Sequence, residues 1–577
     1  MKVIVIPGYS DFFGNKTRTY ESLLEDVSSD VVIKLIISLN NELNVNESVS
    51  EQQIRLRKIV SSRYTKEQLL LLDNGVRKFK LKMPHYDGMI FGRRYLLSML
   101  LRELKRNHKC DTDIDNPIHE FNFLLAYLIV IDEVKEGDGQ VLHRIQMAEK
   151  DEMSRLNMVW AGFVNQYEFN HNVNSVFELF RLVCFSKYCY SNLKTYTKEL
   201  INKNGFKSLS EFLSSYYQLL SSTLNVQIDK PLKKLYFINP KDDVDRTHLR
   251  SQSINKVNNK TSLRISDIRK YPLFETEEKQ FMVIDEDFYR KKIYKGPLFE
   301  IYYDTGLKNI MTFPDYKTKI SKDLFEGICF KAILSSLRKS KYDAVYFDHD
   351  IKSQPDLYFR RANKIILVEF KDYLFPDSVV EGIDVESVRK YIDERFLVSD
   401  KGQSKGINQL TSHVKNLYAG KFDFDKGLST LLEKNKKIEV YPIICYSDFF
   451  FSMPGINEYL SSEFKKRVKD FTYNNSLENV TLVNLEILFD FSTKDGDFGR
   501  LINFINRYWS IIGNRKSKSV KNGGMDNFLS ARVSFDEIYE SIFKKELKQQ
   551  VESKNNKKLD EILDMVGISD GFLEEVL

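Results

Sequence analysis

Two acidic residues and a lysine stand at the ends of two neighbouring apolar segments. Asp356 opens the first segment, and Glu369 and Lys371 close the second, Lys364–Lys371. The run Ile365–Val368 is wholly apolar, which is typical of a strand buried on both faces. Burying a charge in such a strand is unfavourable unless the charge is paired or binds a cation. These three residues are therefore candidates for chemistry rather than for packing.

The spacing predicts that the three side chains share one face of a hairpin. Strand side chains alternate, so Glu369 and Lys371 point the same way. If the hairpin turns at Ala362–Asn363, pairing outward places Asp356 opposite Glu369, with Cβ atoms about 4.5–5.5 Å apart. A three-residue loop would instead put Asp356 opposite Val368, so the prediction needs a loop of even length or a bulge.

Two carboxylates at this spacing repel each other unless a proton or a cation lies between them. Carboxylate oxygens suit a hard divalent ion such as Mg²⁺, for which Mn²⁺ can substitute. Lys371 extends the same face and could hold a phosphate or an attacking water. The three residues thus favour metal-assisted hydrolysis of a phosphodiester bond. The alternative is an ordinary salt bridge between Glu369 and Lys371 at the edge of a sheet.

The order Pro355-Asp356, then Glu369-Phe370-Lys371 at the end of an apolar strand, resembles the PD-(D/E)XK nuclease superfamily, which has the restriction-endonuclease-like fold. The resemblance covers about residues 322–485. It implies that Asp356, Glu369 and the main-chain carbonyl of Phe370 bind Mg²⁺, and that Lys371 positions or helps to deprotonate the attacking water. It also implies cleavage that leaves a 5′-phosphate.

Two further residues match the pattern of this superfamily on the helices that flank the hairpin. Glu326 corresponds to an acidic residue on the preceding helix, and Gln409 to a glutamine on the following helix. The resemblance implies that Glu326 is a further metal ligand and that Gln409 orients Lys371 or a phosphate. The alternatives are a helix-face carboxylate and a capping or surface amide. Exonuclease-like branches often carry a tyrosine where this chain has His413, so the branch stays open.

The surrounding segments predict the elements that position these residues. We expect strands at Phe281–Ile284 and Phe299–Tyr303, a helix at Lys322–Arg338, strands at Ala344–Phe347, Asp356–Arg360 and Lys364–Lys371, helices at Ser387–Phe396 and Gly406–Leu417, and strands at Ile438–Tyr446 and Val480–Leu485. Strands mixed with helices in this way suggest an α/β/α sandwich. The expected fold class is multi-domain α+β, with a mostly helical N-terminal region, a restriction-endonuclease-like core and a small helical C-terminal tail.

The distribution of apolar, polar and charged residues along the chain predicts its domains. We expect a mainly helical N-terminal domain at 1–238, a polar linker at 239–262, the nuclease domain at 263–513, a flexible basic linker at 514–524 and a helical tail at 525–577. Helical spacing in the first domain is clearest at Arg93–Arg106, Glu120–Lys135, Ser175–Cys189 and Ser208–Ser222. This domain is expected to bind nucleic acid, a protein partner or a trigger, or to self-associate.

Composition narrows the class of protein. The chain has 577 residues, 42% of them hydrophobic and 29% charged, with a net charge of +6, which fits a soluble globular protein and is compatible with a polyanionic partner. The five scattered cysteines include no CxxC pair, which suits a reducing cytoplasm. The longest apolar stretch, around Phe123–Ile131, is too short for a membrane helix. We therefore expect a cytoplasmic protein with no membrane partner that binds nucleic acid, with DNA favoured over RNA.

Three biological roles stay open from the sequence alone. A helical module joined to such a nuclease core resembles bacterial anti-phage effectors. A transposon or DNA-repair endonuclease would use the same site. The alternative from a different class is a catalytically silent scaffold or interaction protein that keeps the nuclease fold, and the presence of Asp356, Glu369 and Lys371 argues against it.

Overall fold

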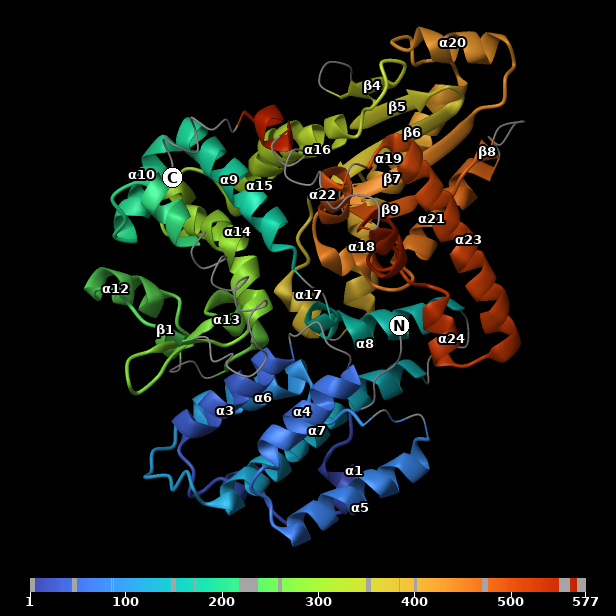
Figure 1. Ribbon diagram of the computed structural model, residues 1–577. Helices are drawn as coiled ribbons and strands as arrows, with labels where there is room; N and C mark the ends of the chain where they lie inside the picture. Colours follow the sequence, from blue (N-terminus) through green and yellow to red (C-terminus); the bar gives the residue numbers. More distant parts are fainter. Residues whose placement is uncertain are drawn as a thin grey trace. The chain divides into compact units, whose positions relative to one another are not determined.

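The computed structural model divides into two compact units, each assembled from segments that are distant in sequence (Figure 1). The residues that it describes are 6–43, 49–84, 86, 88–146, 152–170, 173–216, 237–257, 262–348, 354–382, 384–398, 402–469, 476–494, 496–548 and 561–567. The N-terminal unit contains residues 4–143 and 172–308, and the C-terminal unit contains 144–171 and 309–575. Helices and two sheets make this a multi-domain α+β protein.

Most of the N-terminal unit consists of helices with apolar residues at helical spacing. In α6 (Arg93–Arg106), Leu96, Leu100 and Leu104 are buried, and the helix packs against α3 (Ser29–Glu42). The other helices are α1 (Tyr9–Phe13), α2 (Tyr20–Leu23), α4 (Val49–Val60), α5 (Lys66–Lys82), α7 (Pro117–Gln146), α9 (Ser175–Asn192), α10 (Lys194–Lys203), α12 (Asp243–Ser251), η2 (Ile254–Val257), α13 (Ile265–Lys270), α14 (Glu286–Tyr303) and η3 (Gly306–Asn309). The expected helices within α6, α7 and α9 are confirmed. Of the fourth expected helix, residues 209–216 are helical and 217–222 lie outside the described residues.

A small antiparallel sheet completes the N-terminal unit. Its strands are β1 (Phe237–Ile238), β2 (Leu273–Glu275) and β3 (Phe281–Val283), in the order β1-β3-β2. The strand expected at Phe281–Ile284 is therefore confirmed as β3. The expected strand at Phe299–Tyr303 is wrong, because these residues end α14, in which Leu298, Ile301 and Tyr302 are buried at helical spacing.

The polar segment 239–262 is not a linker. It contains α12 and η2, and the Asp242 side chain caps α12 by accepting a hydrogen bond of 2.8 Å from the main-chain nitrogen of Asp245. Residues 258–261 lie outside the described part of the chain. The aspartates that made this stretch look like a loop act instead as a cap and first turn of a helix, where acidic side chains are favourable.

The C-terminal unit is built on a mixed sheet. Its strands in the described residues are β4 (Ala344–Phe347), β5 (Leu357–Arg361), β6 (Lys364–Lys371), β7 (Glu439–Tyr446), β8 (Ser476–Leu477) and β9 (Thr481–Asn484). The order is β4-β5-β6-β7, with β8 and β9 pairing with the start and the end of β7. The pairs β4-β5 and β5-β6 are antiparallel, and the other pairs are parallel. The strands expected in this region are confirmed: β4 and β6 have the expected ends, and the ends of β5, β7 and β9 differ from the expected ones by at most one residue.

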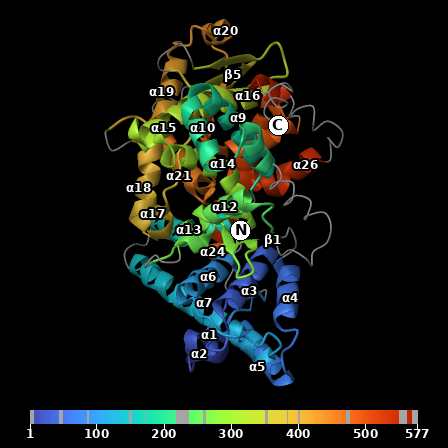
Figure 2. The same ribbon diagram turned by 90° about the vertical axis from the view of Figure 1, so that its left-hand side faces the viewer.

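Helices flank this sheet (Figures 1 and 2). They are α8 (Glu152–Val164), η1 (Tyr167–Asn170), α15 (Phe313–Ile320), η4 (Ser321–Phe330), α16 (Lys331–Ser336), α17 (Asp377–Gly382), α18 (Val385–Phe396), α19 (Gly406–Tyr418), α20 (Lys426–Glu433), η5 (Phe449–Ser452), α21 (Ile456–Val468), α22 (Leu485–Thr493), α23 (Phe498–Asn522), α24 (Met525–Ser530), α25 (Phe535–Ile538), η7 (Tyr539–Phe543) and α26 (Lys544–Lys548). The expected helices at Lys322–Arg338, Ser387–Phe396 and Gly406–Leu417 are confirmed.

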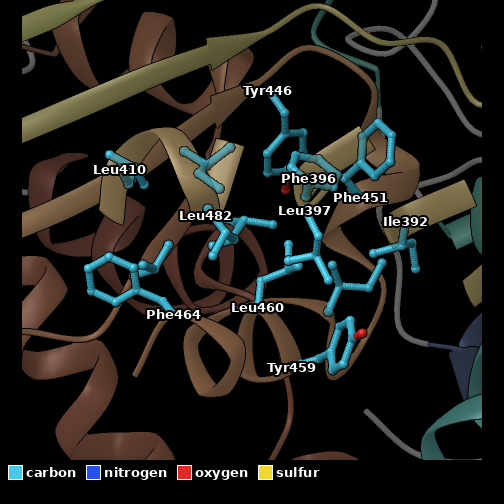
Figure 3. Close-up of a cluster of buried hydrophobic side chains, with 14 of the residues drawn as sticks. Ile392, Phe396, Leu397, Leu410, Tyr446, Phe451, Tyr459, Leu460, Phe464 and Leu482 are labelled. Carbon is cyan, nitrogen blue, oxygen red and sulfur yellow. The ribbon is translucent and has the colours of Figure 1, made fainter. Parts of the chain in front are cut away.

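A large apolar core joins α18, α19 and α21 to the sheet. Phe396 of α18, Leu410 of α19, Phe464 of α21 and Tyr446 of β7 are all buried in one cluster (Figure 3). Burial of apolar surface is the main favourable contribution to folding. This core fixes α19 against β6 and β7, and so fixes the helix that faces the candidate site.

The expected basic linker at 514–524 is also not a linker. Helix α23 continues to Asn522, and the left-handed Gly523, with a φ of 63°, follows its end. Gly513 lies inside the helix with open space around it, so it does not break the helix. The basic residues in this stretch therefore belong to the last turns of a long helix, where positive charge is favourable.

Two segments belong to the C-terminal unit although the sequence suggested otherwise. Trp160 of α8 is fully buried and donates a hydrogen bond of 2.9 Å to the carbonyl of Pro454. The expected helical tail packs into the same unit, because the Tyr508 hydroxyl donates to the carbonyl of Val533 at 3.0 Å. Both segments are therefore parts of this unit, so 1–238 and 525–577 are not separate domains.

Two further features concern the length and polarity of the helices and the state of the cysteines. No helix in the described ranges is long and apolar enough to cross a lipid bilayer. All five cysteines are free thiols, and four of them are buried.

Candidate active site

The hairpin between β5 and β6 has the register that the spacing predicts. Arg361 pairs with Lys364 and Leu357 pairs with Val368, so the loop is the two-residue turn Ala362–Asn363. Ala362 has a φ of 53°, in the left-handed region that two-residue hairpin turns require. The same register, extended by one residue, sets Asp356 opposite Glu369.

On the side of β4, the carbonyl of Asp356 continues the ladder of β5 and accepts a hydrogen bond of 3.3 Å from the main-chain nitrogen of Asp348. On the side of β6, Asp356 uses its side chain: Oδ2 accepts a hydrogen bond of 2.6 Å from the main-chain nitrogen of Phe370. The N–H and C=O of one strand residue point to the same neighbouring strand. The carbonyl of Phe370 therefore faces the Asp356 side of β6, where the sequence analysis expects it.

Lys371 lies between the two carboxylates. Its Nζ is 2.7 Å from Glu369 Oε2 and 4.0 Å from Asp356 Oδ2. The side chain of Glu369 is 1% exposed, and those of Lys371 and Asp356 are 10% and 14% exposed. All three predicted residues thus converge on one face of the sheet, at the carboxyl end of β6.

His413 is a member of this cluster that the sequence analysis did not propose as a site residue. Its Nε2 lies 2.7 Å from Glu369 Oε1, and its side chain is 6% exposed. A carboxylate can only accept, so Nε2 carries the hydrogen and donates. The available signal was its spacing four residues after Gln409, which puts both on one face of α19.

Glu326 approaches the cluster from the other flanking helix. It lies in η4, a stretch of π-helix between α15 and α16, and it is half-buried. Burial raises the pKa of Glu326, Lys371 lowers it, and the charge of Glu369 raises it further, with a net upward shift. The structure brings Glu326 into the electrostatic field of the site without a direct hydrogen bond to Asp356 or Glu369 among the described contacts.

Gln409 lies one helical turn before His413 on α19. Its side-chain Oε1 is buried and has no hydrogen-bond partner in the described structure. A buried amide oxygen without a partner is unfavourable by about 1–3 kcal/mol. Because residues four apart share one face of a helix, Gln409 lies on the face of α19 that carries His413, with an unused acceptor.

The charges of the cluster push the two carboxyl pKa values apart. Burial and the negative charge of Glu369 raise the pKa of Asp356 well above 3.8. Burial opposes ionisation of Glu369 too, but Lys371 and His413 hold its pKa below 4.5. Burial alone would lower the pKa of Lys371, yet Glu369 and Asp356 raise it above 10.5. Glu369 is therefore the ionised partner of Lys371, and Asp356 is the carboxyl group that lacks a full counter-charge.

The donor set fits a hard divalent cation. The donor atoms are all oxygens, from Asp356, Glu369 and the carbonyl of Phe370. The pKa of Asp356 is raised because burial and the negative charge of Glu369 oppose its ionisation, and a bound cation would offset both effects. Within the described ranges, no three His, Cys, Asp or Glu side chains are gathered around one position as metal ligands. Mg²⁺ usually binds through one or two carboxylates together with waters and substrate phosphates, so two carboxylates are sufficient.

Comparison of the chain with known proteins gives no match: no family model, no curated protein and no solved structure matches it.

Proposed function

We propose that this protein is a metal-dependent nuclease of the PD-(D/E)XK type that hydrolyses phosphodiester bonds, with DNA as the favoured substrate. The observation that carries the proposal is the convergence of Asp356, Glu369 and Lys371 on one face of the hairpin. A buried Glu–Lys pair beside a second carboxyl group of raised pKa is the kind of arrangement that functional sites use.

The order of the elements supports the same proposal. A helix carrying Glu326 precedes the antiparallel strands β4, β5 and β6, then α19 leads to β7, which is parallel to β6. This succession agrees with the series of acidic helix, hairpin, glutamine helix and apolar strand by which the sequence resembles the superfamily. On the first of these helices Glu326 lies within the electrostatic influence of Lys371 and Glu369, which supports its inclusion in the proposed site.

The chemistry follows from what each residue can do. Asp356, Glu369 and the carbonyl of Phe370 would hold Mg²⁺ or Mn²⁺. When bound, the ion would supply Lewis acidity at the phosphate and acidify a coordinated water. Lys371 would hold the attacking water or offset negative charge on the phosphate, and His413 holds the carboxylate of Glu369 in place.

The test is a cleavage assay with Mg²⁺ on plasmid, linear and single-stranded DNA and on RNA. Wild type is compared with Glu369→Gln and Lys371→Met. The matched control is the pair Lys364→Met and Glu439→Gln, since these residues form an ion pair of 3.9 Å between β6 and β7, at the opposite end of β6 from Glu369 and Lys371. Loss of one transition-state contact typically lowers kcat by about 100- to 1000-fold.

We expect cleavage by wild type and by the control variants, and loss of at least about 100-fold in the two site variants. Equal cleavage by wild type and Glu369→Gln would overturn the site assignment. No cleavage of any substrate by wild type, with either Mg²⁺ or Mn²⁺, would favour the catalytically silent scaffold.

A further inference from the structure

Two cations, Arg395 and Lys405, lie beside the candidate site without an acidic partner. Among the residues that the structure describes, neither has a carboxylate within 4.0 Å. Two other partly buried arginines of this unit are paired, Arg360 with Asp425 and Arg361 with Asp343. A partly buried cation without an acidic partner is unfavourable, which makes it a candidate to bind an anionic ligand.

The backbone brings these two cations together. Arg395 is in the last turn of α18, and Lys405 directly precedes α19. The main-chain nitrogen of Lys405 donates to the carbonyl of Leu397 at 3.1 Å, and Val398 pairs with Ser404 in an antiparallel bridge. The end of one helix and the start of the next are therefore held side by side.

The same pair lies close to Lys371. Burial lowers the pKa of Lys405, and the positive charges of Lys371 and Arg395 lower it further, while no acidic group opposes them. Three cations thus share one region, and only Lys371 has carboxylate neighbours. The unbalanced charge lies on the Lys405 and Arg395 side.

Arg395 is held against aromatic rings rather than against acids. Its guanidinium carbon lies 5.3 Å from the centre of the Tyr373 ring and 4.8 Å from that of Tyr391. Its Nε is buried and has no hydrogen-bond partner in the described structure. Tyr373 is two residues beyond Lys371, so alternation along the extended chain would place it on the same face.

We propose that Arg395 and Lys405 form a subsite for a backbone phosphate next to the one that is cleaved. This inference rests on the proposed nuclease function and assigns the substrate a polyanionic strand that extends past Lys371. A phosphate supplies the missing negative charge, and an arginine fork and a lysine are the groups that bind phosphate best.

The test is binding, measured by fluorescence anisotropy in EDTA, of a labelled single-stranded 20-mer and of the matching duplex. Wild type is compared with Arg395→Gln, Lys405→Gln and the double variant over a range of salt concentrations. The matched control is Lys390→Gln with Lys415→Gln, which removes two exposed charges from the same helices, α18 and α19. A charge-preserving double variant, Arg395→Lys with Lys405→Arg, tests whether charge alone suffices.

We expect each single variant to weaken binding about tenfold and the double variant to lower the slope of log K against log salt by about 0.7–0.9, as for one lost phosphate contact. The charge-preserving variant should keep that slope, and the control should bind like wild type. Unchanged affinity and slope in the double variant, with an unchanged circular dichroism spectrum, would overturn the subsite. A misfolded double variant would be replaced by the single variants, judged by the same two quantities.

Failure of the nuclease proposal would be distinguishable. Binding in EDTA needs neither metal nor cleavage, so a chain that binds the 20-mer through Arg395 and Lys405 but never cleaves would overturn the function and keep the subsite. A chain that cleaves normally with both residues replaced would do the reverse.

Discussion

His413 Nε2 lies 2.7 Å from Glu369 Oε1, and Lys371 Nζ lies 2.7 Å from the other oxygen of the same carboxylate. Both oxygens of a nearly inaccessible glutamate are therefore engaged, one by a helix and one by its own strand. The orientation of this carboxylate is fixed before any substrate arrives. Such preorganisation is what a catalytic site needs from its surroundings.

Replacing His413 should impair catalysis through Glu369. We expect His413→Leu to lower Mn²⁺ affinity or cleavage about 10- to 100-fold, as is typical when the partner of a metal ligand is lost. His413→Gln can still donate to Glu369 and should recover most of the loss. The measurements are Mn²⁺ affinity by calorimetry and kcat against KM.

Thr411→Val is the matched control for this series. Thr411 is buried on the same helix, and its hydroxyl donates only within α19, to the carbonyl of Ile407 at 2.8 Å. If His413→Leu binds Mn²⁺ and cleaves as Thr411→Val does, His413 is an ordinary core residue.

Replacing Lys371 should separate metal binding from cleavage. The lysine ammonium lies where it neutralises Glu369 and Asp356. In Lys371→Met both carboxylates lose that charge, so we expect Mn²⁺ to bind at least about threefold more tightly while cleavage falls about 100-fold or more. Calorimetry and the cleavage assay report the two quantities. Weaker Mn²⁺ binding in this variant would show that the lysine helps to build the site rather than competing for it.

Replacing Asp356 should stabilise the protein in EDTA, and only at higher pH. The folded-state pKa of Asp356 is above its unfolded value near 3.8, because of burial and of Glu369. Folding therefore favours the protonated form, and stability falls as pH rises through the folded pKa. Asp356→Asn removes this penalty and should raise Tm at pH 7 by about 2–4 °C, the shift that corresponds to 1 kcal/mol in a unit of this size.

The pH dependence is the control for that prediction. Below the unfolded pKa both forms of the residue are neutral, so the difference in Tm between wild type and Asp356→Asn should vanish near pH 3.5, about where an aspartate is mostly protonated. Added Mg²⁺ should stabilise wild type more than the variant. A gain in Tm that is the same at both pH values would contradict the raised pKa.

Replacing Trp160 should destabilise the C-terminal unit, although Trp160 lies far in sequence from the other segment of that unit, 309–575. The indole is fully buried and hydrogen-bonded to Pro454. We expect Trp160→Ala to cost about 3–5 kcal/mol, the usual range for a large aromatic residue in a core. Denaturant unfolding measures this change. Ser517→Ala, an exposed residue of α23 in the same unit, is the control and should stay within about 0.5 kcal/mol.

The hairpin could be predicted from sequence because residues close together in the chain determine its register. The apolar run Ile365–Val368 and the two-residue turn fix the register, and the register alone sets Asp356 opposite Glu369. The roles of Glu326 and Gln409 rested on resemblance, and the structure adds their position but no direct bond to the carboxylates. The local sequence pattern therefore predicted the pairing of Asp356 with Glu369 better than it predicted the roles of Glu326 and Gln409.

Other features could not be predicted because they depend on distant contacts. His413 reads in sequence as one more residue of an amphipathic helix, and only its contact with Glu369 gives it a role. Polar residues in 239–262 and basic residues in 514–524 looked like loops. A cap at Asp242 begins α12 in the first segment, and α23, whose buried residues end at Ile512, continues as a helix to Asn522 in the second. Loop-like composition and helix ends use the same residue types.

The interleaved units have a consequence for synthesis on the ribosome. The chain leaves the N-terminal unit at residue 144, returns to it at 172 and leaves again at 309. Neither unit can therefore finish folding in the order in which its residues emerge. Helix α8, with its large indole, is made long before α18 and the segment around Tyr459, which pack against it. Its apolar face must be shielded for more than a hundred residues of elongation, an interval of about 10 s or more at the usual rates, so nascent chains of this protein are expected to need chaperones.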